Sequence, residues 1–237
     1  MNAYRQSPFA NLTPVVKNLI IINVIFFAGT WILRTQVNLV ELLSAFYFNS
    51  EYFHPWQIIS YMFMHGGFWH IAFNMLALFF FGPTLEYTMG PKRFLQYYFI
   101  TGIGAILLQW FVQAIEVHNI IGAFYTYHGD LSPYVGNPDF GKLQEIYYGP
   151  VLGASGAIFG LLLAFAVLFP NVELMILFIP VPIKAKYAVA GYMVIELVSG
   201  VGQFSGDNVA HFAHLGGALF GFILLKTWRM KSPGNFF

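Results

Sequence analysis

The chain has 237 residues, of which 58% are hydrophobic and only 9% are charged. Soluble domains contain about 45–50% apolar and about 25% charged residues, so this composition indicates that the solvent is lipid. A formal net charge of +1 without a run of Lys or Arg argues against a nucleic-acid-binding surface, and no nucleic-acid partner is expected. The complete lack of cysteine in the sequence excludes disulfides, thiolate catalysis and cysteine-ligated metals.

Six apolar stretches are predicted to be transmembrane helices, because a span needs about 20 residues to cross ~30 Å of hydrocarbon. They are residues 15–33, 58–82, 94–115, 151–169, 186–201 and 209–228. In the first, the apolar run from Leu19 to Leu33 is flanked by Lys17 and Arg34 and is not followed by a small-residue cleavage site, so it is expected to remain as a span. The sequence therefore predicts an all-α polytopic membrane protein, a six-helix bundle forming one domain over residues 1–237.

The segments between the predicted spans differ in character. Residues 34–57 are rich in Phe, Tyr and Trp and are predicted to lie at the headgroup boundary. Residues 116–150 are rich in Gly, Pro, Tyr and Asp and are predicted to be a water-exposed loop. Residues 174–179 are apolar but too short to span, and prolines follow them, so a buried turn is predicted there.

The basic residues set the orientation of this bundle. With the N-terminus inside, all but Arg34 and Lys142 of the 11 Lys and Arg residues fall in cytoplasmic segments. The excess of positive charge on the inner side predicts that both termini are cytoplasmic.

Five polar side chains fall at similar depth in the predicted spans. The second, fourth and sixth spans all run from outside to inside, and the five residues lie in their outer halves: His70, Asn74, Ser155, His211 and His214. Polar groups in hydrocarbon are costly, so each one requires a partner or a function. Their shared depth predicts that they meet in one site.

Glycine spacing indicates how two of these spans approach each other. Gly156/Gly160 in the fourth span and Gly217/Gly221 in the sixth both have the G-x-x-x-G spacing that permits close helix contact in lipid. Such contact would bring the Ser155 hydroxyl within reach of the nearby imidazoles.

These residue types fit a serine hydrolase. Ser155 is predicted to be the nucleophile and His214 the general base. His70 and Asn74 are spaced i, i+4 on one helical face and are predicted to donate hydrogen bonds to an oxyanion, together with the Ser155 backbone N–H. A Ser beside Gly in a membrane helix more commonly bonds its own helix, so the prediction depends on the shared depth and on the glycine pairs.

The other buried polar residues are expected to be structural. His65 and His211 are interpreted as hydrogen-bonding residues, Glu86 as a helix-end or loop anchor, and Asp207 as a helix cap. Glu196, inside the fifth span, is interpreted as a structural hydrogen-bonding group. Since no acid is obviously placed to complete a triad, the sequence predicts a Ser–His dyad.

Three blocks of sequence resemble a known family. They are His65-Gly-Gly-Phe-Trp-His-Ile-Ala-Phe-Asn74, Gly153-Ala-Ser-Gly156 and Ala210-His-Phe-Ala-His-Leu-Gly-Gly-Ala-Leu-Phe-Gly221. In this order they are similar to the signature blocks of rhomboid intramembrane serine proteases of the bacterial six-span form. The resemblance implies that Ser155 and His214 are catalytic and that His70 and Asn74 form the oxyanion hole. It also implies that Phe159, where the family often has Tyr, stacks on the catalytic imidazole.

The resemblance implies an intramembrane endopeptidase that cleaves single-span or polytopic membrane proteins near the outer ends of their transmembrane segments. No metal or organic cofactor is expected, and the expected location is the bacterial inner membrane, with the site opening to the outer face. Two alternatives remain: a non-catalytic relative that escorts membrane clients, and a metal-dependent protein that uses the histidine cluster. The sequence contains no H-E-x-x-H motif, and metal binding would leave Ser155 without a role.

Overall fold

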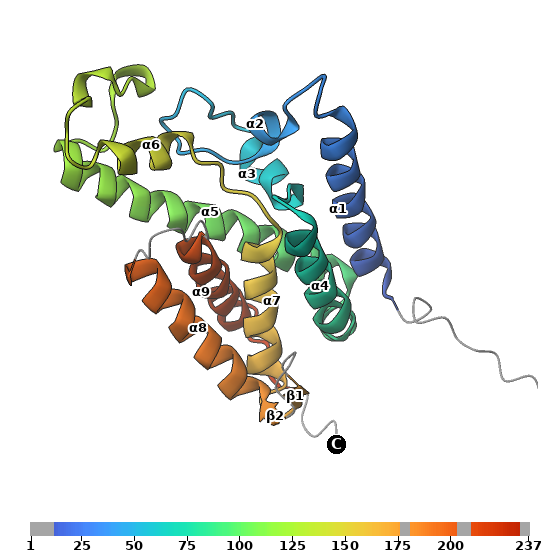
Figure 1. Ribbon diagram of the computed structural model, residues 1–237. Helices are drawn as coiled ribbons and strands as arrows, with labels where there is room; N and C mark the ends of the chain where they lie inside the picture. The colour runs from blue at the N-terminus through green and yellow to red at the C-terminus, as the bar shows by residue number, and fades with distance from the viewer. Residues whose placement is uncertain (1–11, 176–180, 203–209, 233–237) are drawn as a thin grey trace, which may run out of the picture.

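The computed structural model describes residues 12–175, 181–202 and 210–232. In this part of the chain, the helices pack together as a bundle, and a single short β-hairpin lies at one end of it (Figure 1). The longer helices are α1 (Pro14–Leu33), α4 (Phe68–Met89), α5 (Pro91–Ile121), α7 (Ser155–Leu168), α8 (Ala185–Gly202) and α9 (His211–Thr227). The shorter elements are α2 (Leu39–Leu43), α3 (Gln57–Ser60), η2 (Tyr61–Phe63), η3 (Tyr127–Gly129), η4 (Ser132–Tyr134), α6 (Phe140–Tyr148), β1 (Glu173–Met175) and β2 (Pro182–Lys184).

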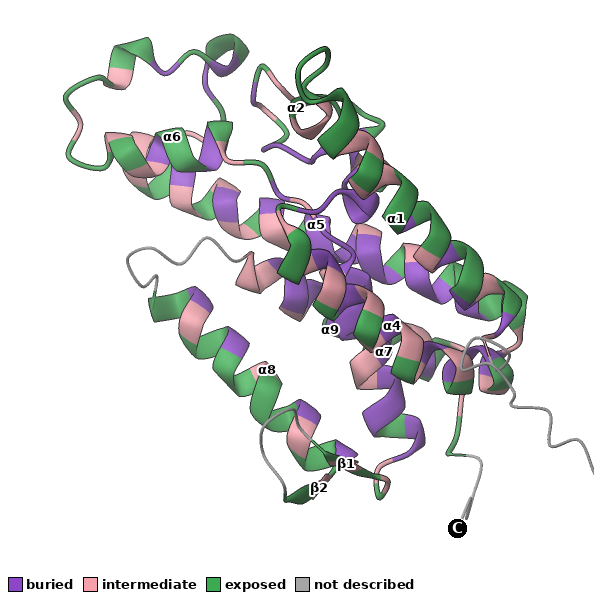
Figure 2. Cartoon of the chain, turned by 45° about the vertical axis from the view of Figure 1, so that its right-hand side comes forward, coloured by how far each residue is buried: buried purple, intermediate pink, exposed green. Residues whose placement is uncertain are grey.

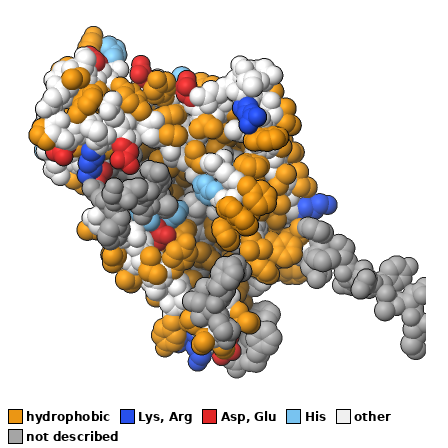
Figure 3. All heavy atoms as spheres, viewed as in Figure 1, with side chains coloured by type: hydrophobic (Ala, Val, Ile, Leu, Met, Phe, Trp, Pro, Cys, Tyr) orange, Lys and Arg blue, Asp and Glu red, His pale blue; other side chains and the backbone are white. Residues whose placement is uncertain are grey.

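Three of the described helices, α1, α4 and α5, are long and apolar enough to cross a membrane by length and composition. Helix α7 is equally apolar in character but has only 14 residues. Hydrophobic side chains cover much of the face shown in Figure 3, and large apolar residues such as Trp31, Ile32 and Phe80 are more than half exposed. Such an apolar surface fits a bundle that faces lipid on its outside.

The second predicted span was wrong at its start. Residues 58–67 do not continue helix α4; they form the end of α3, the turn η2 and an extended stretch, and α4 begins only at Phe68. The backbone at Met64 is extended (φ −87°, ψ 145°), and Gly67 is fully extended (φ 177°, ψ 171°). Two consecutive glycines, Gly66 and Gly67, disfavour helix here, because glycine loses the most conformational freedom on folding.

The fourth predicted span also begins later than expected, at Ser155 and not at residue 151. Gly153 has a φ of +131°, a conformation that L side chains rarely adopt and that cannot belong to a helix. Its N–H donates to the Tyr61 carbonyl at 3.0 Å, which joins this stretch to η2. The chain therefore reaches α7 through a non-helical stretch, and the helix begins at Ser155.

Two connecting segments differ from their predictions. Residues 116–150 are not a single loop: α5 continues to Ile121, and residues 140–148 form α6, whose Leu143, Ile146 and Tyr147 are buried. The described part of 174–179 is not a buried turn, because β1 pairs with β2 in an antiparallel hairpin and Met175 is 76% exposed. Asp207, predicted to be a helix cap, lies outside the described residues.

Glu86 anchors one helix to the start of another, as the sequence predicted. Its carboxylate accepts hydrogen bonds from the Thr13 hydroxyl and from the backbone N–H groups of Val15, at 3.1 Å, and Val16, at 2.9 Å. These N–H groups belong to the first turn of α1, where no intrahelical acceptor exists and where the helix dipole favours negative charge. The anchor fixes the start of α1 against α4.

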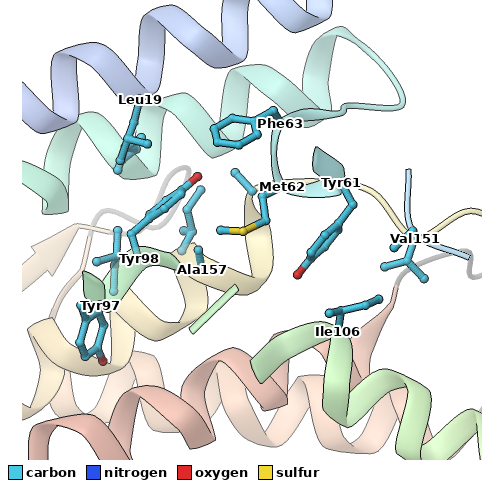
Figure 4. Close-up of a cluster of buried hydrophobic side chains, with 14 of the residues drawn as sticks. Leu19, Tyr61, Met62, Phe63, Tyr97, Tyr98, Ile106, Val151 and Ala157 are labelled. Atoms are coloured by element: carbon cyan, nitrogen blue, oxygen red, sulfur yellow. The ribbon is translucent and has the colours of Figure 1, made fainter. Parts of the chain in front are cut away.

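The centre of the bundle is formed by α5, α7 and α9, which carry most of the buried residues of the described helices, whereas α1 and α8 are largely exposed (Figure 2). The predicted contact between the glycine pairs is confirmed: a Cβ on Gly217 would lie 1.8 Å from the carbonyl oxygen of Gly156. Below α4, residues of η2 such as Tyr61 and Met62 pack toward α5 and α7 (Figure 4). The first turns of α4, α7 and α9 are thereby brought together.

Candidate active site

Ser155 and His214 are in direct contact. Ser155 is the first residue of α7, His214 lies in the first turn of α9, and the distance from Ser155 Oγ to His214 Nε2 is 2.8 Å. That distance is normal for a hydrogen bond between a hydroxyl and an imidazole nitrogen. The two groups that the sequence predicts as nucleophile and base can therefore exchange a proton directly.

A carboxylate lies on the other side of the imidazole, where none was expected from the sequence. Glu196 Oε2 of α8 is 2.8 Å from His214 Nδ1 and 2.7 Å from His211 Nδ1. An ionised carboxylate only accepts hydrogen bonds, so both imidazoles donate from Nδ1. From the sequence, Glu196 was expected to make only a structural hydrogen bond. In the structure, one of its partners is the histidine in contact with Ser155.

The ring of Phe159 covers one face of the His214 imidazole. The two ring centroids are 4.1 Å apart and the planes differ by 5°. Phe159 is one helical turn after Ser155 on α7, so the side chain that stacks on the imidazole comes from the same helix as the hydroxyl. This contact limits rotation of the imidazole, and Phe159 in turn touches Tyr192 of α8 at 4.8 Å between centroids.

His70 and Asn74 lie on the first two turns of α4, beside the serine. The Gly66 N–H donates to His70 Nδ1 at 3.4 Å, so a neutral His70 ring carries its proton on Nε2. Asn74 is 7% exposed, and its side-chain amide nitrogen has no hydrogen-bond partner among the described residues. A buried donor without an acceptor costs roughly 1–3 kcal/mol, which is a reason to expect that a ligand atom satisfies it.

Gly153 leaves space between His70 and Ser155. A Cβ placed on Gly153 would lie 2.8 Å from His70 Nε2 and 3.4 Å from Ser155 Oγ. Because residue 153 is glycine, no side chain fills the position where this Cβ would lie. That position is at hydrogen-bond distance from His70 Nε2. An oxygen there could accept from His70 while it remained attached to a carbon that Ser155 attacks.

Two more histidines were expected to be structural. His65 is buried, lies edge-on to His70 with 5.1 Å between ring centroids, and has its Nδ1 3.3 Å from the Phe63 carbonyl oxygen. Burial and the neighbouring His70 lower the pKa of His65, which lies in the stretch before α4, to about 4, so this ring is neutral near pH 7. His211 is part of the Glu196 cluster and does not touch Ser155 through any contact that the described residues show.

Only one group of three potential metal-binding side chains occurs among the described residues: Glu196, His211 and His214, whose ligand atoms lie within 4.8 Å of one another. All three atoms already take part in hydrogen bonds within the group. His214 also uses its second nitrogen for Ser155, which a purely metal-binding histidine would not require. The donor set and the serine together fit hydrolysis by a hydroxyl better than hydrolysis by a metal-bound water.

The Rhomboid domain profile matches residues 52–230. The chain belongs to the rhomboid family. It is 30% identical over 229 residues to Rhomboid protein 1, mitochondrial, of Saccharomyces cerevisiae, a match that covers 93% of this chain and 56% of the yeast protein. It is also 32% identical over 173 residues to Putative rhomboid protease YdcA of Bacillus subtilis, covering 71% of this chain and 65% of that one.

A further relative is Rhomboid protease AarA of Providencia stuartii, 29% identical over 182 residues, which cover 71% of this chain and 54% of that protein. This rhomboid chain thus spans between about half and two thirds of the length of these relatives. Membership of the family, together with the apolar helices, identifies the chain as an integral membrane protein with a helical bundle. The relatives include both bacterial and mitochondrial proteins.

Proposed function

We propose that this rhomboid protein is an intramembrane serine endopeptidase, which cleaves the transmembrane segments of other membrane proteins near their outer ends. The observation that carries the proposal is the 2.8 Å hydrogen bond between Ser155 Oγ and His214 Nε2, formed by the first turns of two apolar helices. The protease names of the Bacillus and Providencia relatives agree with it.

In the proposed reaction Ser155 Oγ attacks the carbonyl carbon of a substrate peptide bond while its proton moves to His214 Nε2. His214 then gives that proton to the leaving amine. In the second half of the reaction, His214 takes a proton from water, the water oxygen attacks the acyl-enzyme, and His214 returns the proton to Ser155 Oγ. The new C–O bond and the broken C–N bond balance, because the proton that leaves the serine ends on the amine. Neither a metal nor an organic cofactor enters these steps.

The oxyanion of the tetrahedral intermediate is proposed to lie between His70, Asn74 and the Ser155 backbone N–H. Three features support this placement. His70 carries its proton on Nε2, the Asn74 amide nitrogen lacks a partner among the described residues, and Ser155 begins its helix, so its N–H has no intrahelical acceptor. Removing one such donor typically costs about 2.7–4 kcal/mol of transition-state stabilisation.

The depth of the site follows from the short α7. A helix of 14 residues is roughly 21 Å long, less than the ~30 Å of hydrocarbon, so its serine end lies below the membrane surface when its other end reaches the opposite boundary. Water must enter from the side of α2 and α6 to reach Ser155. Substrate helices must unwind locally, because a helical peptide bond is shielded by its own hydrogen bonds.

We further propose six spans, α1, α4, α5, α7, α8 and α9, in a single domain over residues 1–237 with both termini cytoplasmic. In support, α1 begins and α9 ends at the same end of the bundle (Figure 1). Since the sequence lacks cysteine, single-cysteine variants give a direct test. A membrane-impermeant maleimide added to intact cells should label Arg34→Cys but not Lys92→Cys; the reverse pattern would invert the topology.

The proposed location is a bacterial inner membrane, in line with the Bacillus and Providencia relatives, while the yeast relative indicates a mitochondrial membrane as the alternative. Fractionation of the source cells distinguishes the two.

Covalent labelling by a fluorophosphonate tests the proposed chemistry. The wild-type protein in detergent should be labelled at Ser155, and Ser155→Ala should not be labelled. A wild-type protein that stays unlabelled and contains stoichiometric zinc would support the metal-dependent alternative instead. A folded, zinc-free protein that resists labelling would support the non-catalytic, client-binding alternative.

A further inference from the structure

Glu196 is the one acid of α8 and occupies an unusual position. Helix α8 is largely exposed: its buried residues are Ala185, Val189, Glu196 and Gly200. Glu196 is only 4% exposed, so its carboxylate points into the bundle and not toward the outside. A charge buried among apolar helices is costly unless it is paired and hydrogen-bonded, so its partners indicate what it does.

The partners are the two histidines of the first turn of α9. His211 and His214 are three residues apart and share one helical face, and both present Nδ1 to the same oxygen, Glu196 Oε2. Because the carboxylate cannot donate, the His214 proton lies on Nδ1 whenever the ring is neutral. The Nε2 lone pair then faces the Ser155 hydroxyl at 2.8 Å, which is the tautomer that a general base needs.

From this geometry we propose that Glu196 is a positioning residue for His214 and that the site works as a Ser155–His214–Glu196 relay. The inference deepens the proposed protease function and depends on it. Glu196 holds the imidazole in the reactive tautomer, and its negative charge stabilises the imidazolium that forms when Ser155 transfers its proton. Throughout the step the proton on Nδ1 stays on the imidazole, so Glu196 itself is not protonated.

His211 has a separate role in this arrangement. Its N–H gives the same carboxylate oxygen a second hydrogen bond, which keeps the oxygen in place between the two rings. His211 thus supports Glu196 and has no contact with Ser155 among the described residues. The relay also joins α8 to α9, so the catalytic arrangement is complete only while α8 is docked.

A purely structural role of Glu196 and a role in positioning His214 predict different results for a substitution at this residue. In the structural case, substitution lowers the amount of folded protein or its melting temperature but leaves the turnover of the folded fraction unchanged. In the positioning case, substitution lowers kcat at unchanged KM, since the carboxylate touches neither the substrate nor the oxyanion donors.

The test is steady-state cleavage of a model single-span substrate in liposomes by wild type, Glu196→Gln and Glu196→Asp. Glu145→Gln, at an exposed position of α6, is the matched control for the loss of one negative charge. We expect kcat of Glu196→Gln to fall at least ~10-fold, with the ~10⁴-fold loss of an Asp-to-Asn change in a serine-protease triad as the upper end, and KM to stay within about 2-fold. Glu196→Asp should recover part of this loss, and Glu145→Gln should equal wild type.

The outcomes separate the two proposals. A Glu196→Gln variant with wild-type kcat overturns the relay while the protease function stands. A variant that loses kcat and melting temperature together, with no recovery by Glu196→Asp and with an unchanged fluorophosphonate labelling rate per folded molecule, also overturns it. A wild-type protein that neither cleaves nor is labelled overturns the protease function itself.

Discussion

Replacement of Gly153 by alanine perturbs the proposed oxyanion site without altering any of the side chains proposed to perform the chemistry. The new Cβ would lie 2.8 Å from His70 Nε2, the length of a hydrogen bond, and 3.4 Å from Ser155 Oγ. The methyl group would therefore occupy the position of an oxygen that accepts from His70, and the donor would be lost to the transition state.

The size of the effect follows from the two terms involved. Loss of one oxyanion donor costs about 2.7–4 kcal/mol, which corresponds to a roughly 10²- to 10³-fold lower kcat. In addition, the φ of +131° at Gly153 disfavours alanine, and strain of this kind costs on the order of 1–3 kcal/mol of folding stability. We expect a large loss of turnover with a moderate loss of melting temperature.

Cleavage of a single-span substrate in liposomes measures kcat and KM, and differential scanning fluorimetry in detergent measures the melting temperature. Gly67→Ala is the matched control, because Gly67 has extended backbone and its Cβ would meet nothing within 4 Å. If Gly153→Ala kept kcat within about 3-fold of wild type while folded, the oxyanion would not lie between His70 and Ser155. Should Gly153→Ala fail to fold, Asn74→Ala tests the same site.

Three further substitutions test other parts of the account. Gly217→Val should prevent α7 and α9 from approaching and abolish folding or activity, since even a Cβ would lie 1.8 Å from the Gly156 carbonyl oxygen; yield and melting temperature measure this. Glu86→Ala should lower the unfolding free energy by about 1–3 kcal/mol at unchanged kcat, because the start of α1 loses a charged acceptor. Phe159→Leu should lower kcat roughly 2- to 10-fold through loss of the ring stacked on His214.

Each of these three substitutions has an outcome that would contradict the prediction, and the first also has a matched control. Gly191→Val on α8, where a Cβ would meet nothing within 4 Å, should fold and cleave normally; equal damage by both valines would refute the packing argument. A Glu86→Ala protein with the melting temperature of the wild type would show that the hydrogen bonds from the start of α1 to Glu86 contribute nothing to stability. Unchanged kcat in Phe159→Leu would mean that the stacked ring does not restrain the imidazole.

The sequence predicted the approximate positions of the longer helices because a long apolar run is a local signal. The approach of α7 and α9 at Gly156 and Gly217 could be predicted from glycine spacing, because no side chain separates backbones at a G-x-x-x-G pair. The start of α4 was not predicted, because residues 58–67 are largely apolar and hydropathy alone does not separate them from the helix; in the structure they form the end of α3, η2 and an extended stretch.

For the site, the sequence predicted that Ser155 and His214 meet, as they do in the structure, but missed the contact made by Glu196. Hydropathy and depth place a residue along a helix, and they do not say which neighbouring helix it faces. One signal was present: a single acid inside an apolar helix requires a partner, and His211 and His214, three residues apart, offer two donors on one face. The pairing of α8 with α9 in space was needed to connect them.

The central claim is that a hydroxyl and an imidazole on two membrane helices together perform peptide hydrolysis. Cleavage of a model single-span protein in liposomes tests it most directly, with wild type, Ser155→Ala, His214→Ala and His211→Ala compared at equal amounts of folded protein. Wild type should cut within the transmembrane segment, Ser155→Ala and His214→Ala should be at least ~10³-fold slower, and His211→Ala should keep measurable activity. Cleavage by Ser155→Ala at the wild-type rate, or an inactive His211→Ala beside an active His214→Ala, would contradict the account.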